Sequence, residues 1–366
     1  MSQTELGRSL LSKSGEGGRE MSSATALQKG SAIFQNALAR MPQRRPPVWL
    51  MRQAGRYHHH YQQLRSQHSF KDLCRQPELA AEVALGPVLD FGFDAAILFS
   101  DLLFPLEALG MGLEYTDHGP QLGWNLNPNS ISQLRSVDDA WPHLLFQGEA
   151  MRATRERLPD DRSLIGFVGG PWTLFVYAVE GTHKGSLGNS KQLLPLFPEF
   201  CETICPLLER NIQLQLRSGA EIVMIFDTAA GELAPKLFIS EVLPQLEKLT
   251  ARNAKRIGYY SKGTQPAHLH HPLFTKGGLA GIGVDHRWEI SEVLDGFRAG
   301  FVQGNFDQAL LLCDASELER QIRSFLRPLA GKRPNGWICG LGHGVLPTTP
   351  EDNVRLFVDT VREVMQ

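Results

Sequence analysis

Short apolar runs recur along the chain at intervals that leave room for a helix between each run and the next. Several runs are continuously apolar and rich in β-branched residues, and they do not alternate between apolar and polar positions. This pattern is typical of parallel strands that are covered on both faces, because a sheet with one wet face shows alternation. We expect eight strands, within residues 48–51, 94–100, 163–170, 220–227, 256–262, 279–285, 301–307 and 335–344.

The segments between these runs carry helix signals. Pro77 suits the first turn of a helix, and residues 132–158 have apolar positions three and four apart. Ser291 and Ser316 are expected to cap two further helices, and Thr349, which a proline and an acidic first turn follow, is expected to cap the last one. Strands therefore alternate with helices along most of the chain.

This alternation implies a parallel sheet, and about eight repeats favour an α/β fold of one domain, a (β/α)8 TIM barrel whose cleft lies at the C-terminal ends of the strands. A doubly wound open sheet is the alternative, but no GxGxxG motif follows an early strand. Residues 111–129, rich in Gly, Asn and Pro, indicate an inserted loop or hairpin. We assign residues 31–366 to the barrel and expect the Ser/Gly-rich residues 1–30 to be disordered.

The overall composition excludes several classes of protein. A net charge of −2 over 366 residues gives no general field for binding nucleic acid or a membrane surface. No run approaches the about 20 apolar residues of a membrane helix, and the N-terminus lacks the apolar core of a secretory signal. The five scattered cysteines are poor material for a disulfide framework, which fits a reducing cytosol.

The stretch PPVWLMRQAGRYHHHY, residues 46–61, places two arginines directly after the first apolar run. Arg52 and Arg56 present planar guanidinium groups that suit carboxylates or phosphates, so the pair indicates an anionic ligand. Structural salt bridges over the mouth of the barrel are the alternative. The run His58-His59-His60 suggests a metal site, but consecutive side chains point in different directions, so we expect a solvated loop.

Polar residues at the other strand ends are the remaining site candidates. Asp101 closes an apolar run and either acts on a ligand or caps the following turn. His343 lies in the glycine-flanked loop GLGHG, where the backbone can approach a ligand closely or can instead satisfy the imidazole. Lys262 with Gly263 and the late glycine loops give a weak phosphate-binding signal. We find no Cys/His set with zinc spacing and no activated-serine motif.

Taken together, the motifs resemble those of the uroporphyrinogen decarboxylase family. PPVWLMRQAGRY is similar to the first signature of the family, and GFVGGPWTLFVYAVEG, residues 166–181, to the second. AAILFSDLL, QGNFD and GLGHGVLPTTPEDNV also resemble segments of the family, in the same order. The resemblance runs from about Ile33 to the C-terminus.

The resemblance implies a cytoplasmic homodimer of (β/α)8 barrels in haem biosynthesis. Such an enzyme removes the carboxyl groups of the four acetate side chains of uroporphyrinogen III, giving coproporphyrinogen III without metal or organic cofactor. By this likeness, Asp101 accepts hydrogen bonds from the pyrrole N–H groups and Arg52 and Arg56 hold substrate carboxylates. The residues expected to catalyse are Asp101, Arg52, His343 and Tyr177. Those expected to bind the substrate are Arg52, Gln53, Ala54, Arg56, Phe99, Asp101, Tyr177, Thr228 and His343.

The chain also departs from the family pattern. His58-His59-His60 replaces the usual Leu-Pro-Glu, Gly340 replaces an asparagine, His286 a tryptophan and Gln308 a proline, and Thr228 stands where the family commonly has serine. A zinc-dependent methyltransferase of the same barrel superfamily is one rival interpretation, but it needs a His-x-Cys pair that this chain lacks. A catalytically silent porphyrin-binding protein is another, as is a phosphate-binding barrel enzyme.

Overall fold

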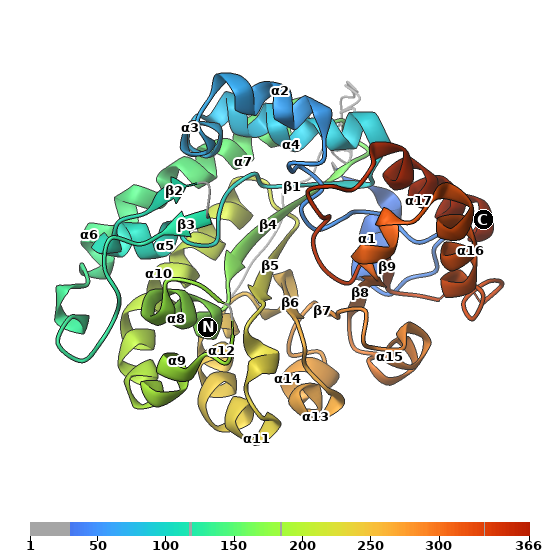
Figure 1. Ribbon diagram of the computed structural model, residues 1–366. Helices are drawn as coiled ribbons and strands as arrows, with labels where there is room; N and C mark the ends of the chain where they lie inside the picture. Colours follow the sequence, from blue (N-terminus) through green and yellow to red (C-terminus); the bar gives the residue numbers. More distant parts are fainter. Residues whose placement is uncertain (1–29, 117–118, 184, 333) are drawn as a thin grey trace, which may run out of the picture.

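The structure is a computed structural model, which describes residues 30–366 except 117–118, 184 and 333. The expected disordered extension therefore lies, apart from Gly30, outside the described residues. Within them, the chain forms an α/β fold around a curled parallel sheet of seven strands (Figure 1). The strands are β1 (Ala95–Ile97), β4 (Ser163–Gly169), β5 (Ile222–Asp227), β6 (Ile257–Ser261), β7 (Gly281–Gly283), β8 (Phe301–Phe306) and β9 (Trp337–Leu341), paired in that order.

Seven of the eight predicted strands are confirmed, and the first one is reduced to an isolated parallel bridge between Val48 and Cys339. Pro46 and Pro47 have no N–H group to extend a ladder, which limits strand formation here. The segment still bonds to both edges of the sheet. Cys339 N–H donates to Pro47 O (2.9 Å), and Asp94 N–H, just before β1, donates to Val48 O (2.9 Å). The Asp94 carboxylate accepts in turn from Val48 N–H (2.8 Å).

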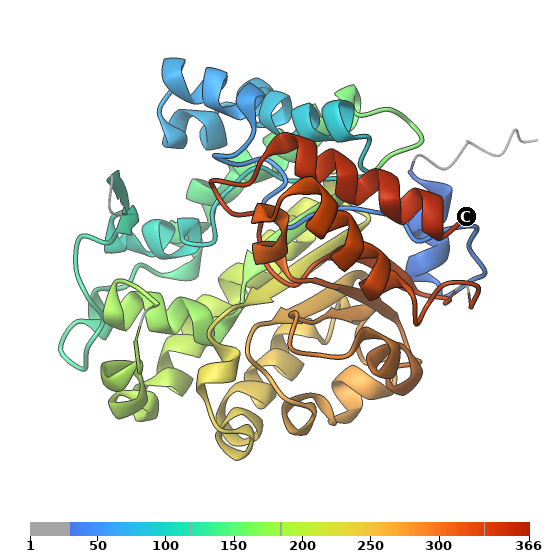
Figure 2. The same ribbon diagram turned by 45° about the vertical axis from the view of Figure 1, so that its right-hand side comes forward.

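Helices cover the outside of the curled sheet, as Figures 1 and 2 show. The longer ones are α1 (Ala32–Leu38), α2 (His59–Gln67), α3 (Phe70–Arg75), α4 (Pro77–Phe91), α7 (Leu145–Arg157), α8 (Pro171–Glu180), α10 (Phe197–Arg217), α12 (Leu243–Thr250), α15 (Ile290–Gly296), α16 (Ala315–Leu326) and α17 (Glu351–Val364). The shorter ones are α5 (Phe104–Leu106), α6 (Val137–Ala140), α9 (Gly188–Gln192), α11 (Pro235–Leu237), α13 (Pro266–Leu269) and α14 (Pro272–Thr275). No described helix is both long enough and apolar enough to cross a membrane.

Helix boundaries follow local chemistry, with some corrections. The predicted start of α4 at Pro77 is confirmed, and the helix ends at Gly92, which takes the left-handed conformation (φ 68°) that glycine favours. Ser316 is not a cap, because the Asp314 side chain accepts from Glu317 N–H one turn later. The predicted Ser291 cap is also wrong, since α15 begins at Ile290. The last helix begins at Glu351, and the predicted Thr349 cap is wrong, because Pro350 occupies the N-cap position and the helix has no side-chain cap.

The inserted segment expected at residues 111–129 is confirmed as a hairpin. Its strands β2 (Glu114–Thr116) and β3 (Gly119–Gln121) are antiparallel, with Tyr115 opposite Pro120. The helical spacing of residues 132–158 corresponds to α6, a 3-10 turn and α7, which Pro142 separates by interrupting the hydrogen-bonding pattern. The hairpin follows α5 along the chain, and the two lie close together in Figure 1.

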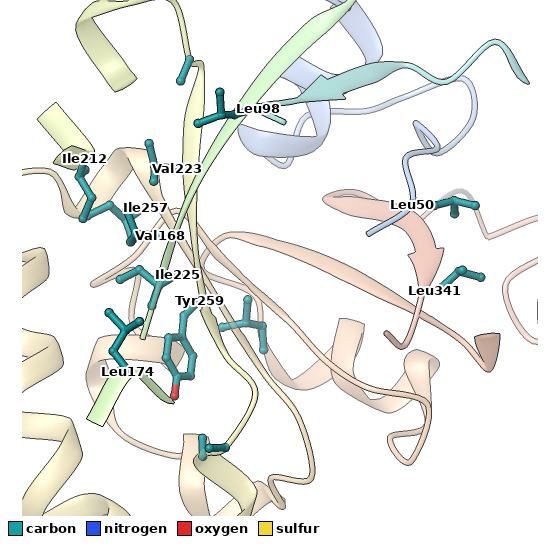
Figure 3. Close-up of a cluster of buried hydrophobic side chains, with 14 of the residues drawn as sticks. Leu50, Leu98, Val168, Leu174, Ile212, Val223, Ile225, Ile257, Tyr259 and Leu341 are labelled. Carbon is teal, nitrogen blue, oxygen red and sulfur yellow. The ribbon is translucent and has the colours of Figure 1, made fainter. Parts of the chain in front are cut away.

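Side chains along each strand alternate between two hydrophobic clusters. On β5, Val223 and Ile225 point to the outer cluster with the helices, whereas Ile222, Met224 and Phe226 belong to an inner cluster. Figure 3 shows outer residues of several strands, Val223, Ile225, Val168 and Ile257, gathered with Ile212 of α10. Both faces of the strands are apolar, which explains the continuously apolar runs in the sequence.

Candidate active site

A cleft lies where the carboxyl ends of several strands meet the MRQAG segment. Its empty volume is about 1030 Å³, including the open mouth. The inner cluster of the sheet supplies an apolar wall through Met51, Ile97, Phe167 and Phe226. The remaining lining residues are Arg52, Ala54, Leu98, Phe99, Ser100, Asp101, Leu102, Leu103, Pro120, Tyr177, Thr228 and His343. Charged and polar groups thus surround an apolar surface, the usual composition of a ligand site.

Asp101 follows β1 and lines this cleft, and protein atoms surround most of its carboxylate. Its Oδ1 accepts from Leu103 N–H (2.8 Å), so part of the expected turn-capping role is real. Burial raises the pKa of Asp101, while the Leu103 amide, the Tyr115 hydroxyl and the Arg52 charge oppose that rise. A carboxylate of this kind is poised to accept donors or positive charge from a ligand.

Arg52 occupies a tight turn after the Val48 bridge. Gln53 N–H donates to Leu50 O (3.0 Å), and Arg52 takes the left-handed conformation (φ 60°), which a non-glycine residue seldom adopts. The stem of its side chain lies over Gly344, where an added Cβ would come within 2.7 Å of Arg52 Cγ. The guanidinium is exposed to the cleft, and its charge lowers the pKa of His343 and opposes the rise at Asp101.

Tyr177 reaches the cleft from α8, and the start of this helix is fixed by Asp227 at the end of β5. Asp227 Oδ1 accepts from both N–H (3.2 Å) and Oγ1 (2.6 Å) of Thr173, and its Oδ2 accepts from Tyr259 Oη (2.9 Å). Gly170 leaves room for this contact, because a Cβ there would lie 2.5 Å from Asp227 Cγ. Complete burial raises the pKa of Asp227 to about 6. Asp227 therefore caps α8 from a neighbouring strand.

His343 stacks on Tyr260, with ring centroids 6.1 Å apart and planes 3° from parallel. Tyr260 Oη donates to Gly342 O (2.7 Å) and lies 3.3 Å from His343 Nδ1. Nδ1–H is then the donor to Tyr260, which leaves Nε2 as the acceptor nitrogen of the neutral ring. Burial first, and then the charges of Arg52 and Lys262, lower the pKa of His343 to about 3. The imidazole is neutral in this state of the protein.

The structure brings together most, but not all, of the predicted site residues. Seven of the nine line the cleft: Arg52, Ala54, Phe99, Asp101, Tyr177, Thr228 and His343. Gln53 is fully buried outside it, because its side chain donates to Ala95 O (3.0 Å) and accepts from Leu50 N–H (3.3 Å). The Gln53 side chain thus holds the turn that carries Arg52 against β1. Arg56 is exposed and does not line the cleft.

The three consecutive histidines do not form the expected solvated loop. His58 is buried and its Nε2 lies 2.7 Å from Asp90 Oδ2, and the other two begin α2. His60 Nε2 lies 3.2 Å from Glu82 Oε1. The histidines therefore join α2 to α4, where the family pattern has Leu-Pro-Glu.

The sequence interpretation missed two kinds of site residue. It did not single out the apolar wall residues Met51, Ile97, Phe167 and Phe226 for the site. Each lies on a different segment, two positions after another residue of the inner cluster, so alternation along each segment would have placed it on the inner face. It also missed His183, whose ring centroid lies 5.9 Å from that of Tyr177. Only the fold could reveal this contact, since Tyr177 lies within the second signature but His183 lies two residues beyond its end.

Within the described part of the chain, no three His, Cys, Asp or Glu side chains are arranged to hold a metal ion. Cys339, which the methyltransferase interpretation would need, belongs to the outer cluster, whereas His343 lines the cleft. All five cysteines carry free thiols. The cleft chemistry therefore consists of one partly buried carboxylate, an arginine, a neutral histidine, hydroxyl groups and an apolar wall.

Comparison with known proteins gives a family match over nearly the whole described chain. The family model described as uroporphyrinogen decarboxylase (URO-D) matches residues 31–364. A uroporphyrinogen decarboxylase from Myxococcus xanthus is 37% identical over 338 residues, covering 89% of this chain and 94% of the relative. One from Synechococcus sp. is 35% identical over 333 residues, covering 87% of this chain and 93% of the relative.

Among solved structures, a methyltransferase from Methanosarcina mazei is similar with a TM-score of 0.72 at 17% sequence identity. The match covers 92% of this chain and 98% of the methyltransferase. A B12-independent methionine synthase from Shewanella sp. W3-18-1 has a TM-score of 0.53 at 12% identity, over 93% of this chain and 97% of the synthase. At such identities the likeness concerns the fold alone.

Proposed function

Because the chain belongs to the uroporphyrinogen decarboxylase family, we propose that it is the carboxy-lyase that converts uroporphyrinogen III into coproporphyrinogen III in porphyrin and haem biosynthesis. The reaction removes the carboxyl groups of four acetate side chains. The observation that carries the proposal is the position of Asp101, a largely buried carboxylate beside an apolar wall, with Arg52 exposed to the same cleft.

The chemistry of the substrate matches this arrangement. Each pyrrole bears an acetate and a propionate, so the macrocycle is strongly anionic at its periphery and presents N–H donors at its centre. We assign the central N–H groups to Asp101 and peripheral carboxylates to Arg52, with Arg56 at the outer mouth. Phe99 and the apolar wall would contact the ring faces, while Ala54, Tyr177, Thr228 and His343 complete the binding surface.

Asp101 is assigned the main electrostatic role. When the pyrrole is protonated, the ring becomes cationic and can accept the electron pair of the C–CO₂ bond as CO₂ leaves. A carboxylate held at the macrocycle centre stabilises that positive charge, and it acts strongly because little water screens it. The new methylene is then protonated to a methyl group, and the proton that was added to the ring is lost, which restores the neutral pyrrole. The pKa of Asp101 is raised by burial, so its ionised form is most favourable when positive charge arises nearby.

His343 and Tyr177 are assigned to proton transfer and positioning. His343 is neutral before the substrate binds, because cations and burial hold its pKa at about 3. Substrate carboxylates would offset the nearby positive charges and raise that pKa, so the imidazole gains its proton only in the complex. Asp227 holds the helix that presents Tyr177, and Gln53 holds the turn that presents Arg52.

The remaining assignments follow the family resemblance. We propose that the Val48 segment serves as the eighth element of a closed (β/α)8 barrel, since it bonds to both edges of the seven-stranded sheet. We also propose that the protein acts as a homodimer in the cytoplasm, without metal or organic cofactor and without nucleic acid or membrane partners.

The test is anaerobic incubation of purified, chelator-treated protein with freshly reduced uroporphyrinogen III. Samples taken over time are oxidised and the porphyrins are separated by carboxyl number. We expect stepwise conversion to the four-carboxyl product. The matched control is Asp101→Asn, which keeps the shape of the side chain and should reduce kcat by at least about 100-fold, the range for lost electrostatic stabilisation. Tight binding without conversion by the wild-type protein would favour a silent porphyrin-binding protein.

A further inference from the structure

Tyr115 lies behind Asp101 in the inserted hairpin, on β2. Its ring packs against Phe70, at 4.5 Å between centroids, and against Phe104, at 6.5 Å. Phe104 follows Asp101 by three residues, and Phe70 in turn contacts Phe99, two residues before Asp101, at 5.7 Å. The ring is therefore held between side chains that flank Asp101 on both sides.

The hydroxyl of Tyr115 is buried and makes no hydrogen bond of standard geometry within the described part of the chain. It nevertheless interacts with Asp101, because burial raises the pKa of Tyr115 and the Asp101 charge is the next cause of that rise. The reciprocal effect is also present, since the Tyr115 hydroxyl lowers the pKa of Asp101. The two groups are therefore neighbours whose contact falls short of a well-formed hydrogen bond.

Other acceptors near the hydroxyl are weaker or already occupied. The Glu107 carboxylate pairs with Lys71 Nζ (2.7 Å) and Arg75 Nη2 (2.7 Å). The Cys74 thiol is buried, and a thiol is a poor acceptor. Asp101 uses Oδ1 for the Leu103 amide and has acceptor capacity to spare. A buried hydroxyl without a partner costs about 1–3 kcal/mol, so a nearby carboxylate with free lone pairs is its natural acceptor.

We propose that Tyr115 is a positioning residue for Asp101: its hydroxyl favours the ionised carboxylate in the free protein, and it closes to a full hydrogen bond, from the side away from the cleft, when a cationic or N–H-rich ligand occupies the site. Asp101 lines the cleft and Tyr115 does not, so the two donors, ligand and tyrosine, approach different sides of the carboxylate. Packing alone accounts for the aromatic ring but leaves the buried hydroxyl unexplained. The catalytic part of this inference rests on the proposed function.

The test compares Tyr115→Phe, which removes only the hydroxyl, with Tyr115→Leu, which also removes ring packing. We expect Tyr115→Phe to lower kcat by about tenfold, the effect of one hydrogen bond to a charged group, while KM changes less than about twofold. The acid limb of the kcat profile should move to higher pH, because Asp101 loses a donor to its ionised form. The melting temperature should stay at or above that of the wild type, since an unpaired buried hydroxyl has been removed.

A second measurement needs no substrate and so separates this inference from the proposed function. The free energy of unfolding is measured across pH for the wild type and for Tyr115→Phe, each with and without Asp101→Asn. Within each pair, the difference in unfolding free energy reports the titration of Asp101. We expect the midpoint to rise by about one pH unit in the Tyr115→Phe background. The groups that face Asp101 and stay unchanged in this comparison are Arg52, Cys74, Leu103 N–H, Glu107 and Tyr177.

An unchanged midpoint would overturn the proposal, as would wild-type turnover and pH profile in Tyr115→Phe. Equal losses of turnover in Tyr115→Phe and Tyr115→Leu, with equally lowered melting temperatures, would indicate a purely structural role and would also overturn it. A wild-type protein without decarboxylase activity would refute the proposed function only, because the midpoint comparison would still report the contact.

Discussion

Asp227→Asn should make the stability of the folded protein less sensitive to rising pH. Asp227 is 0% exposed, and burial raises its pKa to about 6 from the model-compound value of 3.8. Its folded-state pKa is thus above the unfolded one, so the folded protein is most favoured below about pH 3.8 and loses stability as pH rises through about 6. Asparagine keeps an oxygen for Thr173 and offers an NH₂ group to Tyr259, so the capping geometry is retained.

The magnitude follows from the interval between the two pKa values. At about 1.4 kcal/mol per pH unit, ionising Asp227 in the folded protein costs about 3 kcal/mol relative to the unfolded chain. About 2 kcal/mol of this difference falls between about pH 4.5 and about pH 7.5, where unfolding can be measured. Relative to the wild type, Asp227→Asn should therefore become more stable by about 2 kcal/mol across that range.

The assay is equilibrium unfolding in urea, monitored by tryptophan fluorescence at several pH values for both proteins. Subtracting the two curves of unfolding free energy against pH removes the contributions of all other titrating groups. Asp161→Asn, a change at an exposed carboxylate, controls for the loss of one negative charge. If the difference in unfolding free energy between wild type and Asp227→Asn does not change with pH, or changes in the opposite direction, the assignment of a raised pKa to this buried group is refuted.

Two further predictions concern the cleft. Gly344→Ala should displace the stem of Arg52, because the new methyl group would come within 2.7 Å of Arg52 Cγ. We expect KM for uroporphyrinogen to rise about tenfold, with a smaller change in kcat. An unchanged KM would show that this position of Arg52 does not matter for binding. His343→Asn should lower kcat/KM by at least about tenfold yet leave the shape of its pH profile the same between about pH 5 and 8, because kcat/KM reports the free enzyme and there the His343 pKa is about 3. If the kcat/KM profile of the wild type falls off near neutral pH and that fall is missing from the variant, the lowered pKa of His343 is contradicted.

The strands were predictable because burial on both faces leaves a strong signal in the sequence. The runs that contain β4, β5 and β9 are apolar almost throughout, and each strand falls within its predicted range. Val48 was harder to place, since its run is apolar but the preceding prolines cannot extend a ladder. The helix caps at Ser291 and Ser316 were misassigned because Glu289 and Asp314 occupy the N-cap positions, each two residues before the serine.

The site was predictable where motifs fix it, and less so where tertiary contacts do. The MRQAG and GLGHG segments located Arg52 and His343, but the interpretation assumed that Gln53 and Ala54 face the substrate together with Arg52. Gln53 instead turns inward, because its amide satisfies two buried backbone groups. The depressed pKa of His343 could not be foreseen either, since it arises from burial and from cations that lie far apart in the sequence.

The bond between Pro47 and Cys339 also has a consequence for how the chain is made. Arg52 stands only a few residues beyond Pro47, and that segment can bond to Asp94 early, yet it gains its second partner only when β9 has left the ribosome, near the end of synthesis. A nascent chain that lacks β9 therefore holds the Arg52 segment on the β1 side only, with the other edge of the curled sheet unpaired and open to other strands. Because contacts of such long sequence separation form slowly, completion of the cleft should be among the last events of folding.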